Sequence, residues 1–214
     1  TEYSVGLNTA VDAATKALDS LQSTAASHGR AMILEVMGRD AGHIALNAGI
    51  AGGADIILIP EIDYTIEGVI EKLHEIKKNK IGHSLIIVAE SVKKEKGGNV
   101  LNSYNKQKRF GGIGHYIAQE IMKKTDFECR VTSLGHIQRG ATPVAIDRIL
   151  ASAFGVCAVD LIAKRKFNRL VVWQDRKVVD VSIDEGIKDY RKVSKKDTLF
   201  KTALSLGIYL GNKP

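Results

Sequence analysis

The stretch Arg130-Val-Thr-Ser-Leu-Gly-His-Ile-Gln-Arg-Gly140 carries the clearest structural signal in the sequence. It is an apolar, strand-like run that ends in a loop flanked by glycines, with a histidine and an arginine inside it. We predict a helix directly after this loop, because Thr142 suits the N-cap, Pro143 suits the first helical position and Asp147 lies early in the helix. Ligands of open α/β sheets bind beyond the carboxyl ends of the strands. The stretch therefore indicates a site for a small anionic ligand at the end of a strand.

The stretch Arg30-Ala-Met-Ile-Leu-Glu-Val-Met-Gly-Arg39 has the same construction earlier in the chain. It too is an apolar run that delivers a glycine and an arginine into a loop. Guanidinium groups bind phosphate oxygens through paired, charge-assisted hydrogen bonds, and glycine lets backbone N–H groups approach a ligand closely. Two such loops in one chain favour a phosphorylated small molecule as the ligand.

The spacing of apolar residues predicts alternating strands and helices. Strands are expected at Ala31–Val36, Asp55–Ile59, Ser84–Ala89, Glu128–Leu134 and Leu170–Trp173. Helices are expected at Ile44–Ala51, Ile66–Lys78, Ile113–Lys123 and Val144–Ala163, after a first helix with an apolar face of Val11, Ala14, Leu18 and Leu21. We therefore predict an α/β fold with a mostly parallel sheet sandwiched by helices. Because a helix comes before any strand, we also expect the chain to be a fragment.

Three further segments have recognisable patterns. Leu170–Trp173 and Lys177–Val181, separated by Asp175-Arg176, are expected to form an antiparallel hairpin. Ser182-Ile-Asp-Glu185 has the form of a capping box and predicts a late helix. The segment Val92–Phe110 is polar, rich in lysine and interrupted by glycine, so it is expected to leave the core as a flap or an extra surface lobe.

The 214 residues are 44% hydrophobic and 26% charged, an ordinary composition for a protein with a proper core. No apolar run is long enough to cross a bilayer, and no signal-peptide pattern is present. The formal charge of +7 lies mainly between Lys77 and Arg109 and around 192–196, with few interleaved aromatic residues, so we expect no nucleic-acid and no membrane partner. Cys129 and Cys157 lack metal-ligand spacing and are expected to be reduced core residues of a cytoplasmic protein.

The residues that follow the predicted strands form the candidate site. They are Met37, Gly38, Arg39, Pro60, Glu61, Glu90, His136 and Arg139. Because the carboxyl ends of parallel strands share one edge, the arginines and the histidine are expected to neutralise a phosphate there, while Glu90 accepts from a sugar hydroxyl. Each residue also has a structural interpretation: an arginine at a strand end is commonly a surface cation, Glu90 can pair with a following lysine, and His136 can be structural.

Motifs that bind a phosphoryl donor are absent from the sequence. There is no Gly-x-x-x-x-Gly-Lys-Ser/Thr loop, and no strand is followed by Gly-x-Gly-x-x-Gly and a helix. Gly111-Gly-Ile-Gly114 is a weak candidate, since no clear strand precedes it. The other histidines show no spacing typical of a metal site; they are His28, His43, His74, His83 and His115. The sequence therefore indicates a pocket for a phosphoryl acceptor, and we expect no metal ligands in this chain.

The chain resembles the carboxyl-terminal part of the subunit of bacterial-type 6-phosphofructokinase. The similarity is strongest in Thr1–Gly6, Ser27–Gly53, Pro60-Glu61 and Arg130–Ala151. The family signature is a basic residue, four further residues, Gly-His-x-Gln-Arg-Gly and a later Asp-Arg, and this chain matches it except that Ala141 stands where glycine is usual. The resemblance implies a Rossmann-like phosphofructokinase fold that is incomplete at the amino terminus. It implies a sugar-phosphate-binding lobe at 1–124, with an excursion at about 92–110, and a segment 125–214 that completes this lobe and contributes to the donor-side lobe.

The resemblance also implies roles for individual residues. Fructose 6-phosphate would be bound by Met37, Gly38, Arg39, Glu90, His136 and Arg139, and by Arg30 and Arg130, which the family extends across a subunit interface to the 6-phosphate. Arg39 would also act in catalysis by stabilising charge on the transferring phosphoryl group. An effector site would include Gly53, Asp55 and Lys80, while Gln22 stands where bacterial members often carry arginine.

The implied activity is phosphorylation of fructose 6-phosphate at its 1-hydroxyl to give fructose 1,6-bisphosphate in glycolysis. The resemblance implies Mg²⁺ with ATP in the complete enzyme, an allosteric, cytoplasmic homotetramer. This chain would supply the fructose-6-phosphate-binding half, and the missing amino-terminal part of the subunit would supply the general base and the donor loops. We therefore expect the fragment alone to be inactive. Two alternatives stay open: a pyrophosphate-dependent phosphofructokinase, and a non-catalytic regulatory module that binds a phosphosugar.

Overall fold

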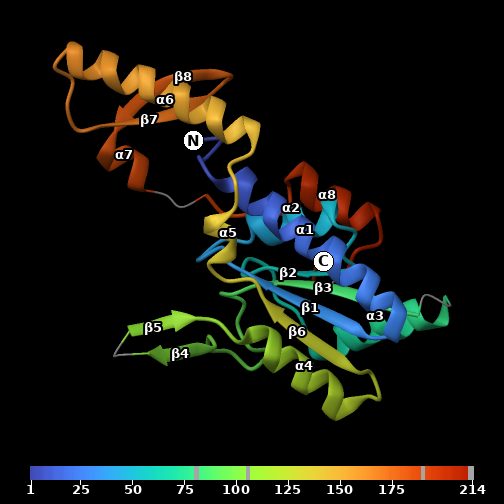
Figure 1. The fold of residues 1–214 in the computed structure, drawn as a ribbon. Helices are drawn as coiled ribbons and strands as arrows, with labels where there is room; N and C mark the ends of the chain where they lie inside the picture. The colour runs from blue at the N-terminus through green and yellow to red at the C-terminus, as the bar shows by residue number, and fades with distance from the viewer. Residues whose placement is uncertain (80–81, 105–106, 189–190, 212–214) are drawn as a thin grey trace. The chain divides into compact units, whose positions relative to one another are not determined.

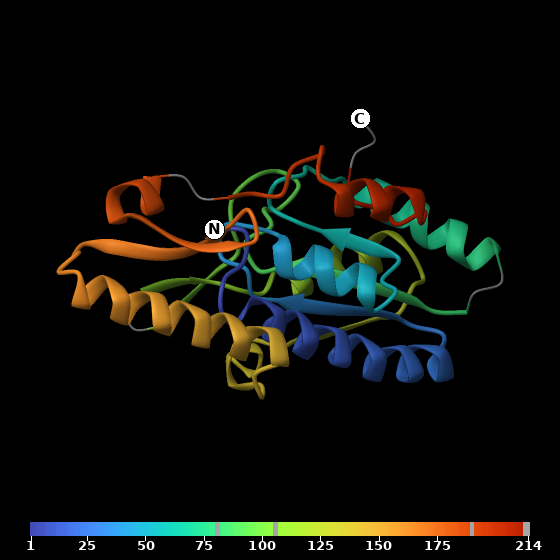
Figure 2. The same ribbon diagram turned by 90° about the horizontal axis from the view of Figure 1, so that it is seen from above.

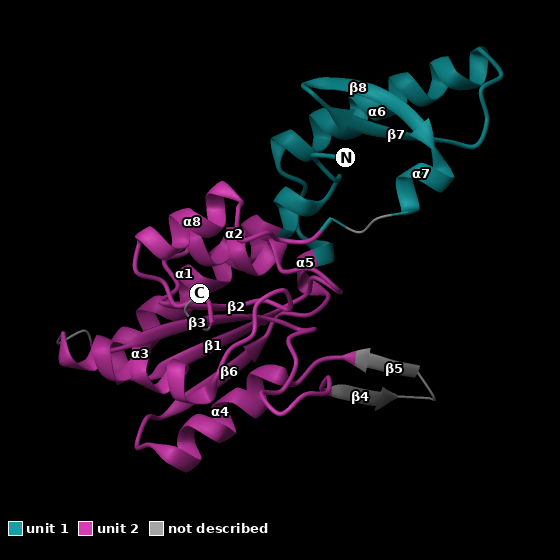
Figure 3. Cartoon of the chain, turned by 180° about the vertical axis from the view of Figure 1, so that it is seen from behind, with its two compact units in different colours: residues 1–10, 139–191 teal, residues 11–138, 192–214 magenta. Residues whose placement is uncertain are grey.

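The computed structural model describes residues 1–79, 82–104, 107–188 and 191–211. The chain forms two compact units, and both are discontinuous in sequence (Figure 3). Unit 1 comprises Thr1–Ala10 and Arg139–Arg191, and unit 2 comprises Val11–Gln138 and Lys192–Pro214. The expected division into a sugar-phosphate-binding lobe at 1–124 and a completing segment at 125–214 is a division by function, and it stays a prediction.

A four-stranded parallel sheet forms the centre of unit 2, in the order β2-β3-β1-β6 (Figure 1). Its strands are β1 (Ala31–Val36), β2 (Ile56–Leu58), β3 (Ser84–Ala89) and β6 (Cys129–Ser133). Every residue of β1, β2 and β3 is buried, as expected for strands that are covered on both faces. The prediction of an α/β fold with a parallel sheet is confirmed, and the predicted bounds of β1 and β3 are those of the structure.

Helices cover both faces of this sheet (Figures 1 and 2). They are α1 (Leu7–His28, in unit 2 from Val11), α2 (His43–Ala51), α3 (Ile66–Lys78), α4 (Ile113–Lys124) and α8 (Thr198–Ser205). Helices α1, α2 and α8 lie on one face, and α3 and α4 lie on the other. The predicted bounds of α3 are exact, because Thr65 caps it by accepting from the Gly68 N–H at 3.0 Å and its buried face follows helical spacing.

The carboxyl-terminal segment of the chain completes unit 2. Tyr209 pairs with Ile56 in a parallel bridge, so this segment lies beside the edge strand β2. The Tyr209 N–H donates to the Asp55 carbonyl at 3.0 Å, and the Ile57 N–H donates to the Tyr209 carbonyl at 2.9 Å. Phe200 and Leu210 are part of the hydrophobic core of this unit. The last strand-like pairing of the sheet therefore comes from a segment far away in sequence.

The polar segment 92–110 contains a two-stranded antiparallel hairpin. Its strands are β4 (Leu101–Tyr104) and β5 (Gln107–Phe110). They pair only with each other and form a sheet of their own among the described residues (Figure 1). The Gly111 N–H donates to the Val100 carbonyl at 3.3 Å where the hairpin joins the rest of unit 2.

Unit 1 contains the hairpin that was expected near its end. Strands β7 (Arg169–Gln174) and β8 (Lys177–Ser182) pair antiparallel, with helix α6 (Ala145–Ala163) and helix α7 (Ile183–Lys188) packed on them. The two turn residues, Asp175 and Arg176, have φ angles of 50° and 62°, as a two-residue type I′ turn requires. The Ser182 hydroxyl accepts from the Glu185 N–H at 3.1 Å, so the predicted cap of α7 is confirmed.

The predicted cap by Thr142, with Pro143 as the first helical residue, is wrong by two residues, whereas the start at Val144 expected from the apolar spacing is one residue early. Helix α6 begins at Ala145, its N-cap is Val144, and no side chain of the N-cap residue bonds to the helix. The reason is a contact distant in sequence. The Thr9 hydroxyl accepts from the Val144 N–H at 3.2 Å, which serves the helix start in place of a cap by Thr142.

Helix α6 is apolar on two opposite faces. Leu150 and Leu161 are buried in unit 1. On the opposite side four apolar residues are between 60% and 67% exposed; they are Ile149, Val156, Val159 and Ile162. A helix that is apolar all round is usually enclosed on all sides, so this exposure is unusual for a surface helix. None of the described helices is both long enough and apolar enough to span a membrane.

Candidate functional site

The candidate site lies at the carboxyl edge of the sheet in unit 2. The strand register pairs Val36 with Ala89 and Glu35 with Ser133, so β1, β3 and β6 end side by side. Beyond this edge the Glu90 N–H donates to the Val36 carbonyl at 2.8 Å, and the Leu134 N–H donates to the Glu35 carbonyl at 2.9 Å. The loops that start at 37, 90 and 134 are therefore neighbours, as the sequence predicted for parallel strands.

The Glu90 carboxylate is bonded to the loop that follows β1. Its Oε1 accepts from the Gly38 N–H at 3.3 Å and from the Arg39 N–H at 3.2 Å. The Gly38 N–H is therefore directed at a carboxylate of the protein. Glycine is needed here for a local reason, because a Cβ at position 38 would lie 2.5 Å from the Ala41 carbonyl oxygen.

Arg39 has an unusual backbone conformation. Its φ of 52° is left-handed, which costs an L-residue other than glycine roughly 1–2 kcal/mol. Its side chain is 80% exposed, and its Nε lies 3.9 Å from Oδ2 of Asp40. A strained backbone that presents an exposed cation is typical of functional loops.

His136 and Gln138 belong to the turn that follows β6. His136 is exposed between Gly135, which has a φ of 49°, and the short helix α5 (Ile137–Gly140). Gln138 is only 2% exposed, and its Oε1 accepts from the Met37 N–H at 2.8 Å. Its Nε2 is buried without a hydrogen-bond partner in the part of the chain that the structure describes. The segment with His136 is thus bonded to the loop with Arg39.

The structure brings part of the predicted set together. Met37, Gly38, Arg39, Glu90 and His136 lie at one edge of one sheet in unit 2. Arg139 is in unit 1, where the Gly135–Gly140 segment crosses from one unit to the other.

Arg30 and Arg130 lie at the other end of the strands. Arg30 precedes β1, Arg130 is the second residue of β6, and both form ion pairs with Glu128. The Arg30 Nε is 2.6 Å from Oε2 of Glu128, while Arg130 contacts Oε1. The hydrogen bond from Arg30 is the main cause that lowers the pKa of Glu128. The Glu128 carboxylate thus binds both guanidinium groups near the amino ends of β1 and β6.

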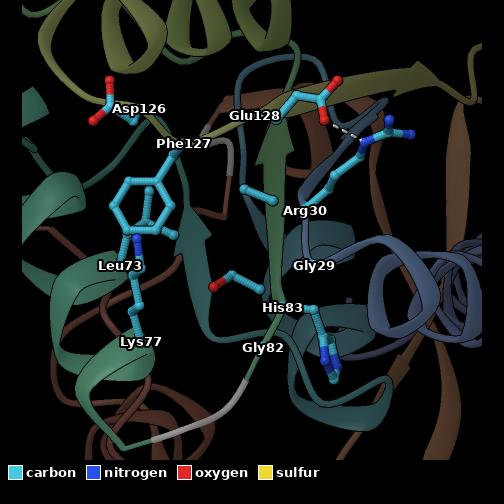
Figure 4. A pocket seen from close by; sticks show the side chains of 11 residues that line it. Gly29, Arg30, Leu73, Lys77, Gly82, His83, Asp126, Phe127 and Glu128 are labelled. Atoms are coloured by element: carbon cyan, nitrogen blue, oxygen red, sulfur yellow. Dashed lines mark hydrogen bonds and ion pairs between the residues drawn. The ribbon is translucent and has the colours of Figure 1, made fainter.

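A pocket of about 260 Å³ opens beside this pair of arginines (Figure 4). Its walls come from the starts of β1 and β3, from the segment just before β6 and from helix α3. The Phe127 ring forms one wall, with the Lys77 Nζ 5.3 Å from the ring centroid. Its lining includes the basic residues Arg30, Lys77 and His83 and the acidic residues Asp126 and Glu128, of which Arg30 and Glu128 are paired with each other.

Two of the three residues predicted for an effector site, Gly53 and Asp55, lie just before β2 at the amino edge of the sheet. Gly53 has a φ of 67°, and Asp55 directly precedes β2. Burial raises the pKa of Asp55, whose Oδ2 accepts from the Leu85 N–H at 2.8 Å. Lys80 lies outside the described residues. Within residues 1–79, 82–104, 107–188 and 191–211, no group of three or more His, Cys, Asp or Glu side chains could hold a metal ion.

Sequence reasoning missed two carboxylates that organise the neighbouring backbone. Glu35 is 3% exposed on β1, and it accepts from the Gly112 N–H at 2.9 Å and from the Gly114 N–H at 2.8 Å. The glycine-rich loop at 111–114 therefore binds a carboxylate of the protein. The only signal for this role was a glutamate inside an otherwise apolar strand. Asp147 is 2% exposed and accepts from the N–H and the hydroxyl of Thr9 within unit 1.

Comparison with known proteins gives consistent matches. The phosphofructokinase family model matches residues 1–162. ATP-dependent 6-phosphofructokinase 1 of Synechocystis sp. is 54% identical over 214 residues, which are 99% of this chain and 59% of that protein. The protein of the same name from Nostoc sp. is 53% identical over 213 residues, again 99% of this chain and 59% of the relative. The chain thus spans less than two thirds of the length of these curated relatives.

Solved structures share the fold. The phosphofructokinase of Saccharomyces cerevisiae matches 97% of this chain and 26% of its own, with a TM-score of 0.76 and 28% identity. A pyrophosphate-dependent phosphofructokinase from Marinobacter aquaeolei matches 96% of this chain and 55% of its own, with a TM-score of 0.72. Its identity is 20%, so this second likeness concerns the fold alone.

Proposed function

Because the chain belongs to the phosphofructokinase family, we propose that it supplies the fructose-6-phosphate-binding part of an ATP-dependent 6-phosphofructokinase. The complete enzyme transfers a phosphoryl group from ATP to the 1-hydroxyl of fructose 6-phosphate and forms fructose 1,6-bisphosphate, a step of glycolysis. The observation that carries the proposal is the edge of the unit 2 sheet. There an exposed guanidinium, a carboxylate and an exposed imidazole follow three adjacent parallel strands.

The residues of this edge suit the phosphoryl acceptor. Glu90 takes two backbone N–H groups through Oε1, and we propose that its Oε2 accepts from a sugar hydroxyl. Met37 and Gly38 line the sugar, and His136 binds its phosphate. The family signature assigns Arg139, which belongs to unit 1, to the same phosphate. Phosphoryl transfer depends mainly on positioning and on stabilising negative charge, so the exposed Arg39 guanidinium acts on the transferring group.

Arg30 and Arg130 fit a role in a neighbouring copy of the chain. The Arg130 side chain is 50% exposed and the Arg30 side chain is 28% exposed, so solvent reaches both guanidinium groups. We propose that they bind the 6-phosphate of a fructose 6-phosphate held by the adjacent subunit of a homotetramer. A phosphate dianion is a stronger acceptor for two guanidinium groups than a single exposed carboxylate.

The donor is assigned from the relatives. Proteins that are 54% and 53% identical are named ATP-dependent, which supports ATP over pyrophosphate. ATP is used with Mg²⁺ in phosphoryl transfer, but the described residues offer no ligand cluster for this ion. The donor site and the general base belong, in this proposal, to the part of the relatives that this chain does not span. The proposal includes a cytoplasmic location and an effector site near Gly53 and Asp55.

Turnover by the complete protein tests this function. We expect formation of fructose 1,6-bisphosphate with MgATP and little with pyrophosphate at equal concentration, and we expect no turnover by the 214-residue chain alone. Binding of fructose 6-phosphate without turnover on either donor would favour a regulatory phosphosugar-binding module. Turnover with pyrophosphate alone would assign the other donor.

A further inference from the structure

The loop Met37–Gly42 between β1 and α2 is held by three side chains that all act as acceptors for its backbone. Gln138 accepts from the Met37 N–H at 2.8 Å. Glu90 accepts from the next two N–H groups at 3.3 and 3.2 Å. Glu61 accepts from the Gly42 N–H with both oxygens, at 3.0 and 3.1 Å. Three of the four strands of the sheet thus send one acceptor each to the loop that follows the remaining strand, β1.

The loop does not keep this conformation by its own preferences. Arg39 has a left-handed backbone, which only external contacts can maintain in a residue with a Cβ. Two of the three acceptors are carboxylates, and hydrogen bonds to an ionised acceptor are stronger than neutral ones. The bonds therefore fix the direction in which the loop presents the exposed Arg39 side chain.

The beginning of the loop depends on Gln138. This residue is 2% exposed and belongs to the turn after β6, where its own N–H donates to the Gly135 carbonyl at 3.3 Å. Its bond to Met37 joins the segment that carries His136 to the segment that carries Arg39. This bond opposes a displacement of one segment relative to the other.

The end of the loop depends on Glu61. Its Oε1 also accepts from the Val193 N–H at 2.9 Å, so the loop is connected to the carboxyl-terminal segment of unit 2. Gly42 packs tightly at this point, since a Cβ there would lie 2.3 Å from the Ile59 Cβ and 2.9 Å from Oε2 of Glu61. The contact leaves no room for the loop end to shift toward β2.

We propose that Gln138 and Glu61 are positioning residues for the acceptor site: they fix the two ends of the loop whose middle carries Arg39. The proposal rests on the function assigned above, because it concerns the same edge of the sheet. Neither residue needs to touch the substrate. Each acts by keeping the loop in the conformation in which the Arg39 N–H donates to Glu90.

The test compares two substitutions at one position. Gln138→Met keeps the length of the side chain and removes the acceptor, whereas Gln138→Glu keeps an acceptor oxygen in either protonation state. The first readout is hydrogen exchange of the Met37 amide in the 214-residue chain. The second is the KM for fructose 6-phosphate and for ATP in the complete protein. We expect Gln138→Met to speed the exchange and to raise the KM for fructose 6-phosphate about tenfold each, equivalent to roughly 1.4 kcal/mol. The KM for ATP should stay within about twofold. In Gln138→Glu, the exchange rate of the Met37 amide and the KM for fructose 6-phosphate should both stay close to those of the parent protein.

Two outcomes overturn the proposal: unchanged exchange at Met37 in Gln138→Met, or equal effects of the two substitutions. Failure of the function assigned above looks different, because the complete protein would then show no turnover while exchange at Met37 still responded to Gln138→Met. If Gln138→Met does not fold, Glu61→Leu against Glu61→Gln makes the same comparison. The readouts are then exchange at the Gly42 amide and the same two KM values, judged by the same criteria.

Discussion

Thr9 and Asp147 are 138 residues apart in sequence, yet the Thr9 N–H and hydroxyl both donate to Oδ2 of Asp147, at 2.8 and 2.5 Å. The same hydroxyl accepts from the Val144 N–H, so a residue near the amino terminus supports the start of α6. Burial alone would raise the pKa of Asp147, but the hydrogen bonds from Thr9, Gly6 and Asn8 outweigh it and lower this pKa below its usual value.

The lowered pKa of Asp147 predicts how acid affects unit 1. A carboxyl with a depressed pKa in the folded state contributes stability that is present above the unfolded pKa and is lost as the pH falls through the folded one. We expect the free energy of unfolding to decrease as the pH falls below about 5. The decrease continues past roughly 3.9, the ordinary pKa of Asp, because the pKa in the folded state is lower. Asp147→Asn should flatten this dependence and cost about 1–3 kcal/mol at pH 7. Urea unfolding across this range measures both effects, and identical pH profiles for the two proteins would contradict the assignment.

Gly38→Ala is expected to disturb the loop after β1. The added Cβ would meet the Ala41 carbonyl oxygen at 2.5 Å, which is backbone and cannot rotate away. We expect a loss of roughly 1–3 kcal/mol in stability, together with weaker binding of fructose 6-phosphate. Gly155→Ala is the matched control, because nothing lies within 4 Å of a Cβ there and the position is inside α6. That substitution should stabilise the chain by up to about 1 kcal/mol. Thermal unfolding measures the stability of both variants. Equal losses of stability in Gly38→Ala and Gly155→Ala would argue against a special role for Gly38.

Arg139→Ala should weaken binding of the phosphoryl acceptor, fructose 6-phosphate, without weakening binding of the donor, ATP. Removing one member of a charged pair with a phosphate typically costs roughly 2–5 kcal/mol. In the complete enzyme we expect the KM for fructose 6-phosphate to rise by a large factor, while the KM for ATP changes little. Arg165→Ala, at an exposed position just after α6, serves as the control and should leave both KM values near those of the parent. Equal losses for sugar and nucleotide in Arg139→Ala would remove this residue from the acceptor site.

The exposed apolar face of α6 predicts self-association of the isolated chain. Val156 and Val159 are 67% and 65% exposed on one side of the helix. Large exposed apolar patches promote association, so the double substitution Val156→Ser and Val159→Ser should lower the apparent molecular mass at high protein concentration. Sedimentation velocity at several concentrations provides the measurement. A monomer at all concentrations, with or without the two substitutions, would show that this face does not drive association.

The sequence predicted the sheet well because its strands are encoded locally. β1 and β3 are continuous apolar runs between polar or glycine-rich segments, and the bounds of both were predicted exactly. The same holds for α3, whose start is set by Thr65 immediately before it. The parallel order then placed Arg39, Glu90 and His136 at one edge, since parallel strands end on the same side.

Contacts between segments that are distant in sequence could not be predicted from local sequence patterns. The cap of α6 was assigned to Thr142, whereas Thr9 serves the helix start, and no local pattern indicates a partner so distant in sequence. Glu35 was not identified because an acidic residue within an apolar strand does not say which amides it will meet. The acceptor role of Gln138 depends on the register between β1 and β6, which only the folded sheet defines.

The most direct measurement of the central claim is a crystal structure of the complete protein with fructose 6-phosphate. The account predicts the sugar at the carboxyl edge of the unit 2 sheet, with a hydroxyl donating to Glu90, the Arg39 guanidinium near the 1-hydroxyl, and His136 and Arg139 at the phosphate. Density for the sugar at the amino edge, beside Asp55 or in the pocket lined by Phe127, with this loop left vacant, would contradict it.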